Sequence, residues 1–371
     1  MKYPKKNILF VINSFEIGGS ENQLLNLLTN FNKQKLNISL FALNINGSLK
    51  KKYFNLPINV INHNNNFIKK YYYLYKYLKK NKNSIVHCFL SKSYLLIFLM
   101  SFFCKISYLI LSRRSRNFYQ KKNIFVSFFE RLAHKKTNKF LCNSREIIAD
   151  LLDEGVSINK INLVYNGIDL QLVEQVKKKR IIFKKQKIHQ DKIKIICVAN
   201  FYEYKGHKDL IESLNIIKDL FIEKCHLILI GNDRGSKKSI ISLLRKYKLN
   251  KYVTIIDNTI DVYPYLLQSD IGVLLSHQEG FSNSILEYML SSLCVVATDV
   301  GSNKMLLSHD IKNIVEVGNI ELIAKTLKNC IIKSNRDRFV IGNKSRQKVK
   351  DKFNIKNITL EYHSIYEDIK T

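Results

Sequence analysis

Two glutamates in the segment SHQEGFSNSILEYML are the side chains best placed for chemistry. Glu279 precedes Gly280, and Glu287 lies eight residues later, inside a helix expected to begin near Ser282 to Ser284. Both carboxylates should point into the same binding site. The N–H groups between them can bind phosphate oxygens, and Glu287 can accept hydrogen bonds from two ribose hydroxyls. The segment therefore predicts a nucleotide site. It also reads as a Ser284-x-x-Glu287 capping box, and that alternative stays open.

Two other segments combine glycine with a helix start. Lys205 and Gly206 precede the helical sequence HKDLIESLNIIKDL, where an ammonium group and a closely approaching backbone suit a diphosphate. A solvated surface lysine is the alternative. Gly18 and Gly19 open an amphipathic helix whose first N–H groups could face an anion, although an ordinary turn with Ser20 as N-cap would look the same. The chain has neither a G-x-G-x-x-G fingerprint nor a P-loop.

Short apolar runs alternate with helix-like segments and would position these motifs. Runs that are apolar throughout are typical of parallel strands covered on both faces, and parallel neighbours need long crossovers. The predicted strands lie at 7–13, 37–43, 58–63, 84–89, 108–114, 139–144 and 161–166, and then at 193–200, 226–232, 253–257, 271–276, 295–299 and 313–317. We therefore expect two doubly wound α/β sheets, with ligands beyond the carboxyl ends of the strands.

A length of 371 residues suits two domains. We predict an N-terminal α/β domain over 1–175, a C-terminal α/β domain over 190–350, and a final helix over 351–371 that crosses back to the first domain. The charged segment 170–192, which has no glycine, is the expected linker.

The net charge of +31 is concentrated in residues 1–150. That half holds only five acidic residues, which are Glu16, Glu21, Glu130, Glu146 and Asp150. A basic field attracts anionic membranes, phosphorylated molecules or nucleic acid alike, and lysine-rich codon usage would also produce it. No zinc module or aromatic RNA-binding signature supports nucleic acid.

Seven cysteines, never spaced C-x-x-C, predict buried thiols in a reducing cytoplasm. The first apolar run is too short for a signal peptide. Lys105 interrupts the most apolar stretch, Tyr94 to Leu111, which favours a buried helix and strand over a membrane span. We expect a cytoplasmic protein.

Seven segments resemble, in order and spacing, those of the family 4 glycosyltransferases of the GT-B fold. They are GGSE at 18–21, NS at 143–144, VYNGID at 164–169, YKGHKDL at 204–210, LIGND at 229–233, SHQEGFSNSILEYML at 276–290 and VVATDVGSN at 295–303. The resemblance implies two facing Rossmann-like domains with an interdomain cleft, the domain over 1–175 for the acceptor and the domain over 190–350 for the nucleotide-sugar donor. It also implies retention at the anomeric carbon, with no bound metal and no cofactor.

The resemblance assigns roles to single residues. Lys205 corresponds to the cation at the donor diphosphate, Glu279 to the group beside the donor sugar, and Glu287 to the ribose ligand. His87 corresponds to a catalytic histidine near the transferred sugar, although Phe89 replaces the second histidine of the usual pair and a structural histidine is the alternative. The other implied donor-binding residues are Gly18, Gly19, Asn200, Gly280, Phe281, Ser282 and Asn283.

Three departures affect the donor site more than the fold. Asn200 stands where the family commonly has arginine, so the diphosphate lacks one cation unless Arg234 substitutes. Met305 replaces a glutamate expected after Gly301 and Ser302, and Ser292 to Cys294 replace a Gly-x-Pro turn. We therefore expect altered donor affinity and altered sugar contacts.

The implied function is a retaining glycosyltransferase. Its donor is expected to be a UDP-sugar, with a GDP-sugar as the second choice. Its acceptor would be a glycan or a polyprenyl-diphosphate-linked glycan in bacterial capsule or O-antigen synthesis. A nucleotide-sugar 2-epimerase, acting on the donor alone, and a non-catalytic partner subunit are the alternatives.

A basic aromatic segment, FIKKYYYLYKYLKK at 67–80, suits the headgroup zone of an anionic membrane, where a lipid-linked acceptor would reside. Five further cations are expected to belong to the same basic surface. They are Arg113, Arg114, Arg116, Lys121 and Lys122. This predicts peripheral contact with the inner face of the cytoplasmic membrane, and an ordinary solvated helix face is the alternative.

Overall fold

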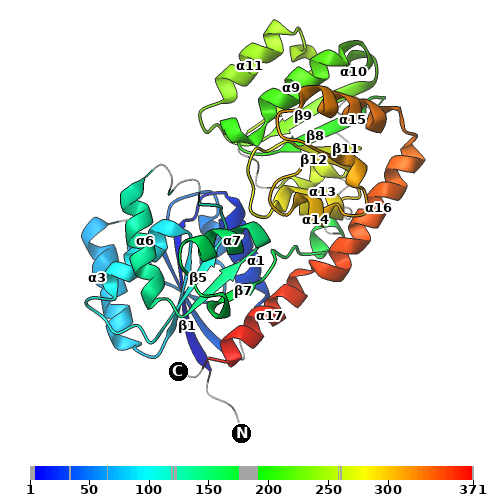
Figure 1. Ribbon diagram of the computed structural model, residues 1–371. Helices are drawn as coiled ribbons and strands as arrows, with labels where there is room; N and C mark the ends of the chain where they lie inside the picture. The colour runs from blue at the N-terminus through cyan, green and yellow to red at the C-terminus, as the bar shows by residue number, and fades with distance from the viewer. Residues whose placement is uncertain are drawn as a thin grey trace. The chain divides into compact units, whose positions relative to one another are not determined.

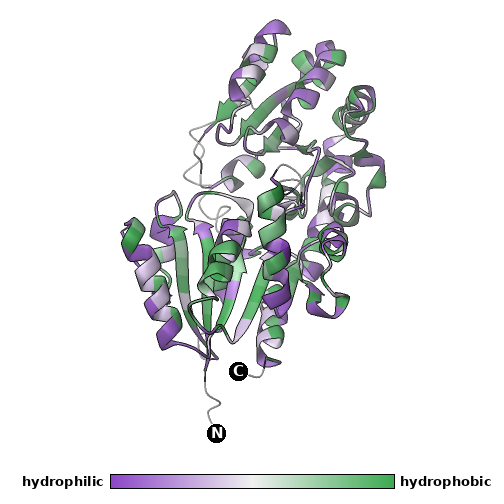
Figure 2. Ribbon diagram, turned by 60° about the vertical axis from the view of Figure 1, so that its left-hand side comes forward, coloured by the Kyte–Doolittle hydropathy of each residue, from purple (hydrophilic) through white to green (hydrophobic). Residues whose placement is uncertain are grey.

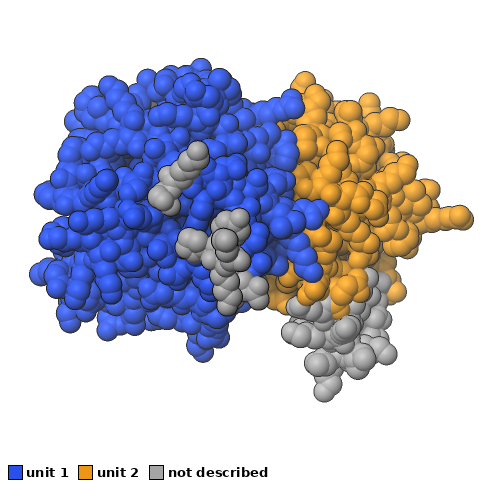
Figure 3. All heavy atoms as spheres, turned by 90° about the horizontal axis from the view of Figure 1, so that it is seen from below, with its two compact units in different colours: residues 1–167, 355–371 blue, residues 168–354 orange. Residues whose placement is uncertain are grey.

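The computed structural model describes residues 5–32, 35–64, 66–117, 120, 123–174, 191–257, 259 and 261–369. It divides into two compact units, Met1–Gly167 with Ile355–Thr371, and Ile168–Asn354 (Figures 1 and 3). Most of the predicted linker lies outside the described residues.

Unit 1 is built on a seven-stranded parallel sheet with the strand order β3-β2-β1-β4-β5-β6-β7. Figure 2 shows these strands as mostly hydrophobic ribbons. Their apolar side chains alternate between two cores, one on each face, which is why the runs are apolar throughout. The strands are β1 (Lys6–Ser14), β2 (Leu36–Asn44), β3 (Asn59–Val60), β4 (Ile85–Phe89), β5 (Tyr108–Arg113), β6 (Lys139–Cys142) and β7 (Ile161–Leu163).

Helices cover both faces of this sheet. One core contains side chains of α1 (Gly19–Asn30), α2 (Lys50–Phe54) and α17 (Ile355–Glu367). The core on the opposite face contains side chains of α3 (Phe67–Lys80), α4 (Ser91–Met100), α6 (Ile124–Lys136) and α7 (Arg145–Asp153).

The last helix, α17, belongs to unit 1 although it follows unit 2 in the chain. Its Ile358, Tyr362 and Tyr366 are buried in the core that also contains α1. Gly167 lies against this helix, because a Cβ there would be 2.8 Å from the Ile355 Cα. The two ends of the chain are therefore packed into the same unit.

Unit 2 has a six-stranded parallel sheet with the order β10-β9-β8-β11-β12-β13. Its strands are β8 (Ile193–Val198), β9 (Cys225–Ile230), β10 (Val253–Ile256), β11 (Ile271–Leu274), β12 (Cys294–Thr298) and β13 (Ile314–Val315). Its helices are α9 (His207–Ile216), α10 (Lys218–Lys224), α11 (Lys237–Lys246), α12 (Tyr263–Leu266), α13 (Asn283–Leu290), α14 (Asn303–Leu306), α15 (Ile320–Ile332) and α16 (Asn335–Lys352).

Each predicted strand segment overlaps one of these strands, and the prediction of two parallel-sheet α/β domains is confirmed. That the two sheets face each other across a cleft stays a prediction. All seven cysteines are free and buried. Within the described part of the chain, no helix is both long enough and apolar enough to cross a membrane.

Candidate functional site

Three loops meet at the carboxyl edge of the unit 2 sheet. They follow β8, β11 and β12, which are neighbours in the sheet. The His277 N–H of the second loop donates to the Tyr204 carbonyl of the first at 2.7 Å. The Ser302 N–H of the third loop donates to the Gly280 carbonyl of the second at 3.0 Å. Backbone hydrogen bonds thus hold the loops that carry most of the predicted donor site.

Lys205 ends a short 3-10 helix, Glu203–Lys205, and Gly206 then starts α9. Gly206 has a φ of +69°, in the left-handed region. A Cβ there would lie 1.9 Å from the Leu275 carbonyl oxygen. Only glycine satisfies both constraints, so this residue lets the Lys205 turn pack directly against the end of β11.

Lys205 and Glu279 form an ion pair across the first two loops. The Lys205 Nζ lies 2.6 Å from the Glu279 Oε1, and the two side chains are 19% and 11% exposed. Burial lowers the pKa of Lys205, but the neighbouring carboxylate more than offsets this, and the net pKa is above its usual value. The ammonium group therefore stays charged at the edge of the sheet.

The Glu279–Gly280 turn is held from the other side by the loop after β12. Ser282 Oγ donates to Asn303 Oδ1 at 2.8 Å, and Asn303 Nδ2 donates to the Thr298 carbonyl at 3.0 Å. Gly301, with a φ of +51°, approaches so closely that a Cβ would lie 2.5 Å from the Gly280 carbonyl oxygen. The turn before α13 is consequently rigid.

Glu287 is not part of a capping box. The N-cap of α13 is Ser282, so Ser284 lies inside the helix. The Ser284 hydroxyl donates to the Val198 carbonyl of β8 at 2.7 Å. This tertiary hydrogen bond removes Ser284 from the cap and ties α13 to the central strand. The capping alternative is therefore wrong.

The surroundings of Glu287 are unusual for a carboxylate. Burial raises its pKa to about 7, and the nearby Asp261 carboxylate adds to the shift. Tyr263 is 6% exposed, and its hydroxyl is buried with no protein hydrogen-bond partner among the described residues. Burial raises the pKa of Tyr263, and Glu287 and Asp261 raise it further. The hydroxyl therefore keeps its proton beside two carboxyl groups.

Asp261 and Tyr263 are site residues that the sequence analysis missed. They precede and start α12, which packs against α13. The available signal was the sequence DVYPYL, which follows the carboxyl end of a predicted strand at 253–257. This is where ligands of parallel sheets bind.

Asn200 supports the loops instead of adding a charge. Its Oδ1 accepts the Asn232 N–H at 2.9 Å, which joins the ends of β8 and β9. Arg234, the suggested substitute cation, is exposed in the turn after β9.

The Met305 carbonyl accepts a hydrogen bond from the Lys348 ammonium group. Phe281 packs edge-on against Phe353, with ring centroids 5.7 Å apart.

The two glycines of the GGSE motif lie in unit 1, at the start of α1. Gly18 is the N-cap in an extended conformation, and Gly19 is the first helical residue. The alternative with Ser20 as N-cap is therefore wrong. The Glu21 carboxylate lies over Gly18, because a Cβ at Gly18 would be 2.3 Å from Glu21 Oε2. An anion approaching these amides would have to displace that carboxylate.

His87 is fully buried in β4, as the structural alternative expects, and its catalytic role stays a prediction. Its Nδ1 bonds the Tyr366 hydroxyl at 2.7 Å, and its Nε2 bonds the Ser112 hydroxyl at 2.8 Å. Burial lowers its pKa well below the usual value, and Arg114 lowers it further. With both nitrogens engaged, His87 joins α17 to the sheet.

Two of the five cations expected beside the basic helix, Arg113 and Arg114, are buried, and a third, Arg116, is paired at a part-exposed position, which corrects their placement on an open basic surface. Arg113 forms a buried bidentate pair with Glu154 at 2.8 and 3.0 Å. Arg116 pairs with Asp150 at 2.7 Å. Arg114 is 8% exposed and donates to the Tyr362 hydroxyl. These arginines hold unit 1 together. Lys121 and Lys122 lie outside the described residues.

Two family models together cover both units. The model described as Glycosyltransferase Family 4 matches residues 17–172, and the one described as Glycosyl transferases group 1 matches residues 178–349. The chain belongs to the family 4 glycosyltransferases. The most specific part of the family pattern, Glu279 to Glu287, is the part that the loop contacts above hold in place.

Named relatives of this family member come from several bacteria. One is N-acetylgalactosamine-N,N'-diacetylbacillosaminyl-diphospho-undecaprenol 4-alpha-N-acetylgalactosaminyltransferase of Campylobacter jejuni, 27% identical over 66% of this chain and 66% of that protein. Another is the O-antigen biosynthesis glycosyltransferase WclY of Escherichia coli, 26% identical over 57% of this chain and 56% of its own length. The chain thus spans roughly half to two thirds of these relatives.

Solved structures share the fold along nearly the whole chain. HepE of Anabaena, in complex with UDP and glucose, has a TM-score of 0.82 at 15% identity and covers 98% of this chain and 99% of its own. A glycosyltransferase from Rickettsia africae has a TM-score of 0.76 at 18% identity and covers 99% of both chains. At these identities the likeness concerns the GT-B fold alone.

Most of the predicted donor-binding residues share one edge of unit 2. They are Asn200, Lys205, Gly280, Phe281, Ser282, Asn283 and Glu287, and Glu279 lies with them. Gly18, Gly19 and His87 belong to unit 1, which is a separate compact unit. The unit 2 edge combines one cation, a helix start and a partly buried carboxylate. Chemically, that set can bind a diphosphate and a diol.

Proposed function

We propose that this protein is a retaining glycosyltransferase that moves a sugar from a nucleotide-sugar donor to a glycan acceptor in surface-polysaccharide synthesis. The observation that carries the proposal is the Lys205–Glu279 pair, held at 2.6 Å between two loops and next to the start of α13. UDP is the first choice for the nucleotide, in line with the complexes of HepE with UDP and UDP-glucose.

The donor diphosphate binds between Lys205 and the start of α13. Phosphate oxygens compete with Glu279 for the ammonium group, and the helix dipole favours the negative charge. The Ser282 hydroxyl does not cap the helix, because it donates to Asn303. Glu287 accepts ribose hydroxyls from inside the same helix, as its partly buried position permits.

The chemical step breaks the bond between the anomeric carbon and the diphosphate oxygen. Negative charge builds on the leaving diphosphate, and Lys205 and the α13 amides stabilise that charge more than they stabilise the bound donor. The acceptor hydroxyl attacks the anomeric carbon from the same face and gives its proton to the leaving phosphate. Glu279, released from Lys205, accepts a hydrogen bond from a hydroxyl of the donor sugar. The scheme calls on no metal ion and no protein base.

The acceptor is a glycan, carried on a polyprenyl diphosphate at the inner face of the cytoplasmic membrane. The diphospho-undecaprenol in the name of the Campylobacter relative supports this choice of carrier. Unit 1 also exposes large apolar side chains at the starts of two helices. They are Phe67, Ile68 and Tyr72 on α3, and Ile124, Phe125 and Phe128 on α6. Lysines accompany them on α3, as membrane-surface helices require.

A radiolabelled transfer assay tests the proposal. The purified protein is incubated with UDP-sugars and lipid-extracted acceptors, after a thermal-shift screen has identified the nucleotide that raises the unfolding temperature. Replacing Lys205 by Ala should lower kcat by about 10² to 10³, because one stabilising contact to the leaving group is lost. Lys208→Ala removes an exposed lysine three residues away and should leave kcat unchanged.

Three results would contradict the proposal. The Lys205→Ala enzyme could retain full kcat, which would remove Lys205 from the leaving-group site. The wild-type protein could epimerise the donor sugar without any acceptor, which would favour the epimerase. It could also bind nucleotide without turnover, as expected of a partner subunit.

A further inference from the structure

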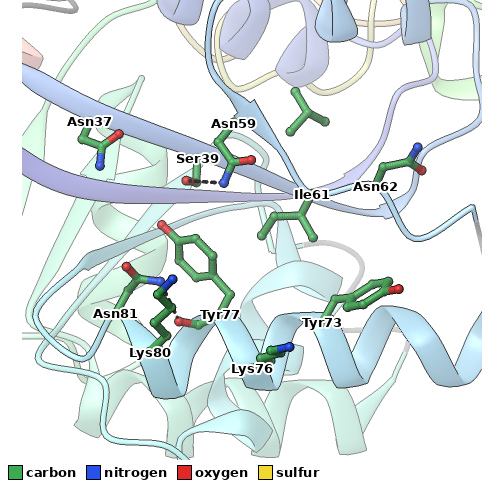
Figure 4. A pocket seen from close by; sticks show the side chains of 11 residues that line it. Asn37, Ser39, Asn59, Ile61, Asn62, Tyr73, Lys76, Tyr77, Lys80 and Asn81 are labelled. Atoms are coloured by element: carbon green, nitrogen blue, oxygen red, sulfur yellow. Dashed lines mark hydrogen bonds between the residues drawn. The ribbon is translucent and has the colours of Figure 1, made fainter.

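A cavity of about 470 Å³ lies in unit 1 between α3 and the β2–β3 edge of the sheet (Figure 4). This volume is within the range of about 300–1,000 Å³ that is usual for small-molecule sites. Its sheet wall is set by the amino-terminal half of β2, at Asn37 and Ser39. Ligands of the transferase chemistry are expected at the opposite end of parallel strands, beyond their carboxyl ends.

The sheet wall of the cavity is mostly polar, with Asn37 and Asn59 exposed and Ser39 buried, and Val60 and Ile61 are its apolar members. On β2, Asn37 and Ser39 alternate with Leu36, Ile38 and Leu40, which belong to the core on the other face. Further along the strand, Phe41 on the cavity side is apolar again. The polar positions are therefore a local interruption of an apolar face.

The interruption continues across three neighbouring strands. Asn7 of β1 is paired in register with Asn37, and Ser39 is paired with Asn59 of β3. Asn37 Nδ2 donates to Asn7 Oδ1 at 2.7 Å, and Asn59 Nδ2 donates to Ser39 Oγ at 3.2 Å. These contacts fix the direction of the amides, so the wall is preorganised.

The helix wall is also a continuous polar stripe. Tyr73, Lys76, Tyr77 and Lys80 have the spacing i, i+3, i+4 and i+7, which puts them on one face of α3. Leu74 and Leu78 anchor the helix to the core beside this stripe. Figure 4 shows the Tyr77 ring between the helix and the strands, with Lys76 and Lys80 along the helix.

We propose that this cavity is a second carbohydrate-binding site that holds an acidic saccharide unit of the polymer on which the protein acts. Amides, a hydroxyl and two phenols can bond sugar hydroxyls, and the tyrosine rings can pack on sugar C–H faces. Two ammonium groups select a carboxylate-bearing sugar. The lining, all of it described, has no carboxylate, so the site binds and does not catalyse.

A free nucleotide fits the cavity less well than an acidic sugar. The end of α3 that lines it is the carboxyl end, whose partial negative charge opposes a multiply charged diphosphate. A single sugar carboxylate carries one negative charge, which the Lys76 and Lys80 ammonium groups can pair with. The inference rests on the proposed function for the choice of a glycan ligand. A bound polymer here would keep the protein close to its acceptor between transfers.

Calorimetric titration of the full-length protein tests this site. The probes are a hyaluronan tetrasaccharide, which carries uronic acids, and maltotetraose, which is neutral. We expect the acidic probe to bind and Lys76→Gln/Lys80→Gln to weaken it by about tenfold, because two charge-assisted hydrogen bonds are lost. Lys69→Gln/Lys79→Gln makes the same charge change elsewhere on α3 and should weaken it less than about twofold.

A charge-neutral variant separates hydrogen bonding from charge. Asn59 is exposed at the rim, and Asn59→Leu removes an amide that can bond sugar hydroxyls, so it should weaken binding of the acidic probe while UDP affinity stays unchanged. The inference is overturned if the wild-type protein does not bind the acidic probe, if maltotetraose binds equally well, or if both lysine pairs weaken binding alike. It is also overturned if inorganic phosphate displaces the probe fully. Loss of UDP-sugar turnover with intact probe binding would instead overturn the proposed function.

Discussion

Glu287 connects the chemistry of the site to the stability of unit 2. Burial holds its pKa near 7, well above the value of about 4.3 expected in an unfolded chain. A carboxyl group whose pKa is raised on folding opposes folding once it is ionised. The free-energy cost of ionising Glu287 in the folded protein is absent below about pH 4. It grows between the unfolded and the folded pKa and reaches its full size above about pH 7. Such a cost is typical of a residue kept for binding.

Replacing Glu287 by Gln should therefore stabilise the protein and weaken nucleotide binding. We expect the unfolding midpoint in urea to rise at pH 8 and to match the wild type near pH 4, because only the charged form is penalised. UDP affinity should fall about tenfold, since an amide is a poorer acceptor for ribose hydroxyls. Glu223→Gln, at an exposed position of the same unit, is the control. Unchanged UDP affinity would show that Glu287 is not a ribose ligand.

The strands of this fold were predictable because covered parallel strands need continuous apolar runs, and such runs are local in sequence. The start of α13 was ambiguous, since Ser282 and Ser284 are both good N-cap residues. A hydrogen bond from Ser284 to the Val198 carbonyl, 86 residues away, decides it. Local sequence cannot reveal that contact. The buried surroundings of His87 were hidden from the sequence for the same reason, because its partner Tyr366 lies 279 residues further on.

Between elements, a buried ionic network joins β5, α6 and α7. Glu154, the C-cap residue of α7, accepts a bidentate pair from Arg113 and a hydrogen bond from His134 Nε2 at 2.9 Å. Burial alone would raise the pKa of Glu154, but His134 and Arg113 lower it to about 2. Because the pKa is depressed, the network stabilises the fold above the unfolded value, and this contribution disappears as the pH falls toward 2.

Replacing Glu154 by Gln should destabilise unit 1 by about 3–5 kcal/mol at pH 7, because Arg113 is left as a buried charge without its main partner. The difference from the wild type should shrink as the pH is lowered below about 4, where the Glu154 carboxylate of the unfolded wild-type chain begins to take up protons while the folded protein still keeps it ionised. Urea unfolding at pH 7, 5 and 3.5 measures it. Asp153→Asn, at an exposed neighbour, should change stability by less than about 0.5 kcal/mol. A pH-independent difference would mean that packing, not charge, is lost.

On the scale of the whole molecule, the excess positive charge is distributed differently from the sequence-based prediction. Arg113 is paired with Glu154 inside unit 1 and Arg116 is paired with Asp150 at a part-exposed position, so the most accessible cations of this region are the lysines of α3. Both α3 and α6 cover the same face of a parallel sheet and precede the next strand, so their amino-terminal ends lie at the same sheet edge. Their exposed apolar side chains therefore share that edge with Lys69 and Lys70, the two lysines at the start of α3.

Vesicle co-sedimentation tests whether this edge binds a membrane. The full-length protein should bind vesicles of phosphatidylglycerol and phosphatidylcholine more strongly than vesicles of phosphatidylcholine alone, and added salt should release it, because screening weakens the attraction of the lysines. Phe125→Ser/Phe128→Ser should reduce the bound fraction several-fold by removing buried apolar area from the lipid boundary. Leu360→Ser, at an equally exposed leucine on α17, should not. The membrane contact would be contradicted if vesicle binding did not depend on lipid charge or salt, or if all three substitutions weakened it equally. The acceptor would then be a soluble glycan.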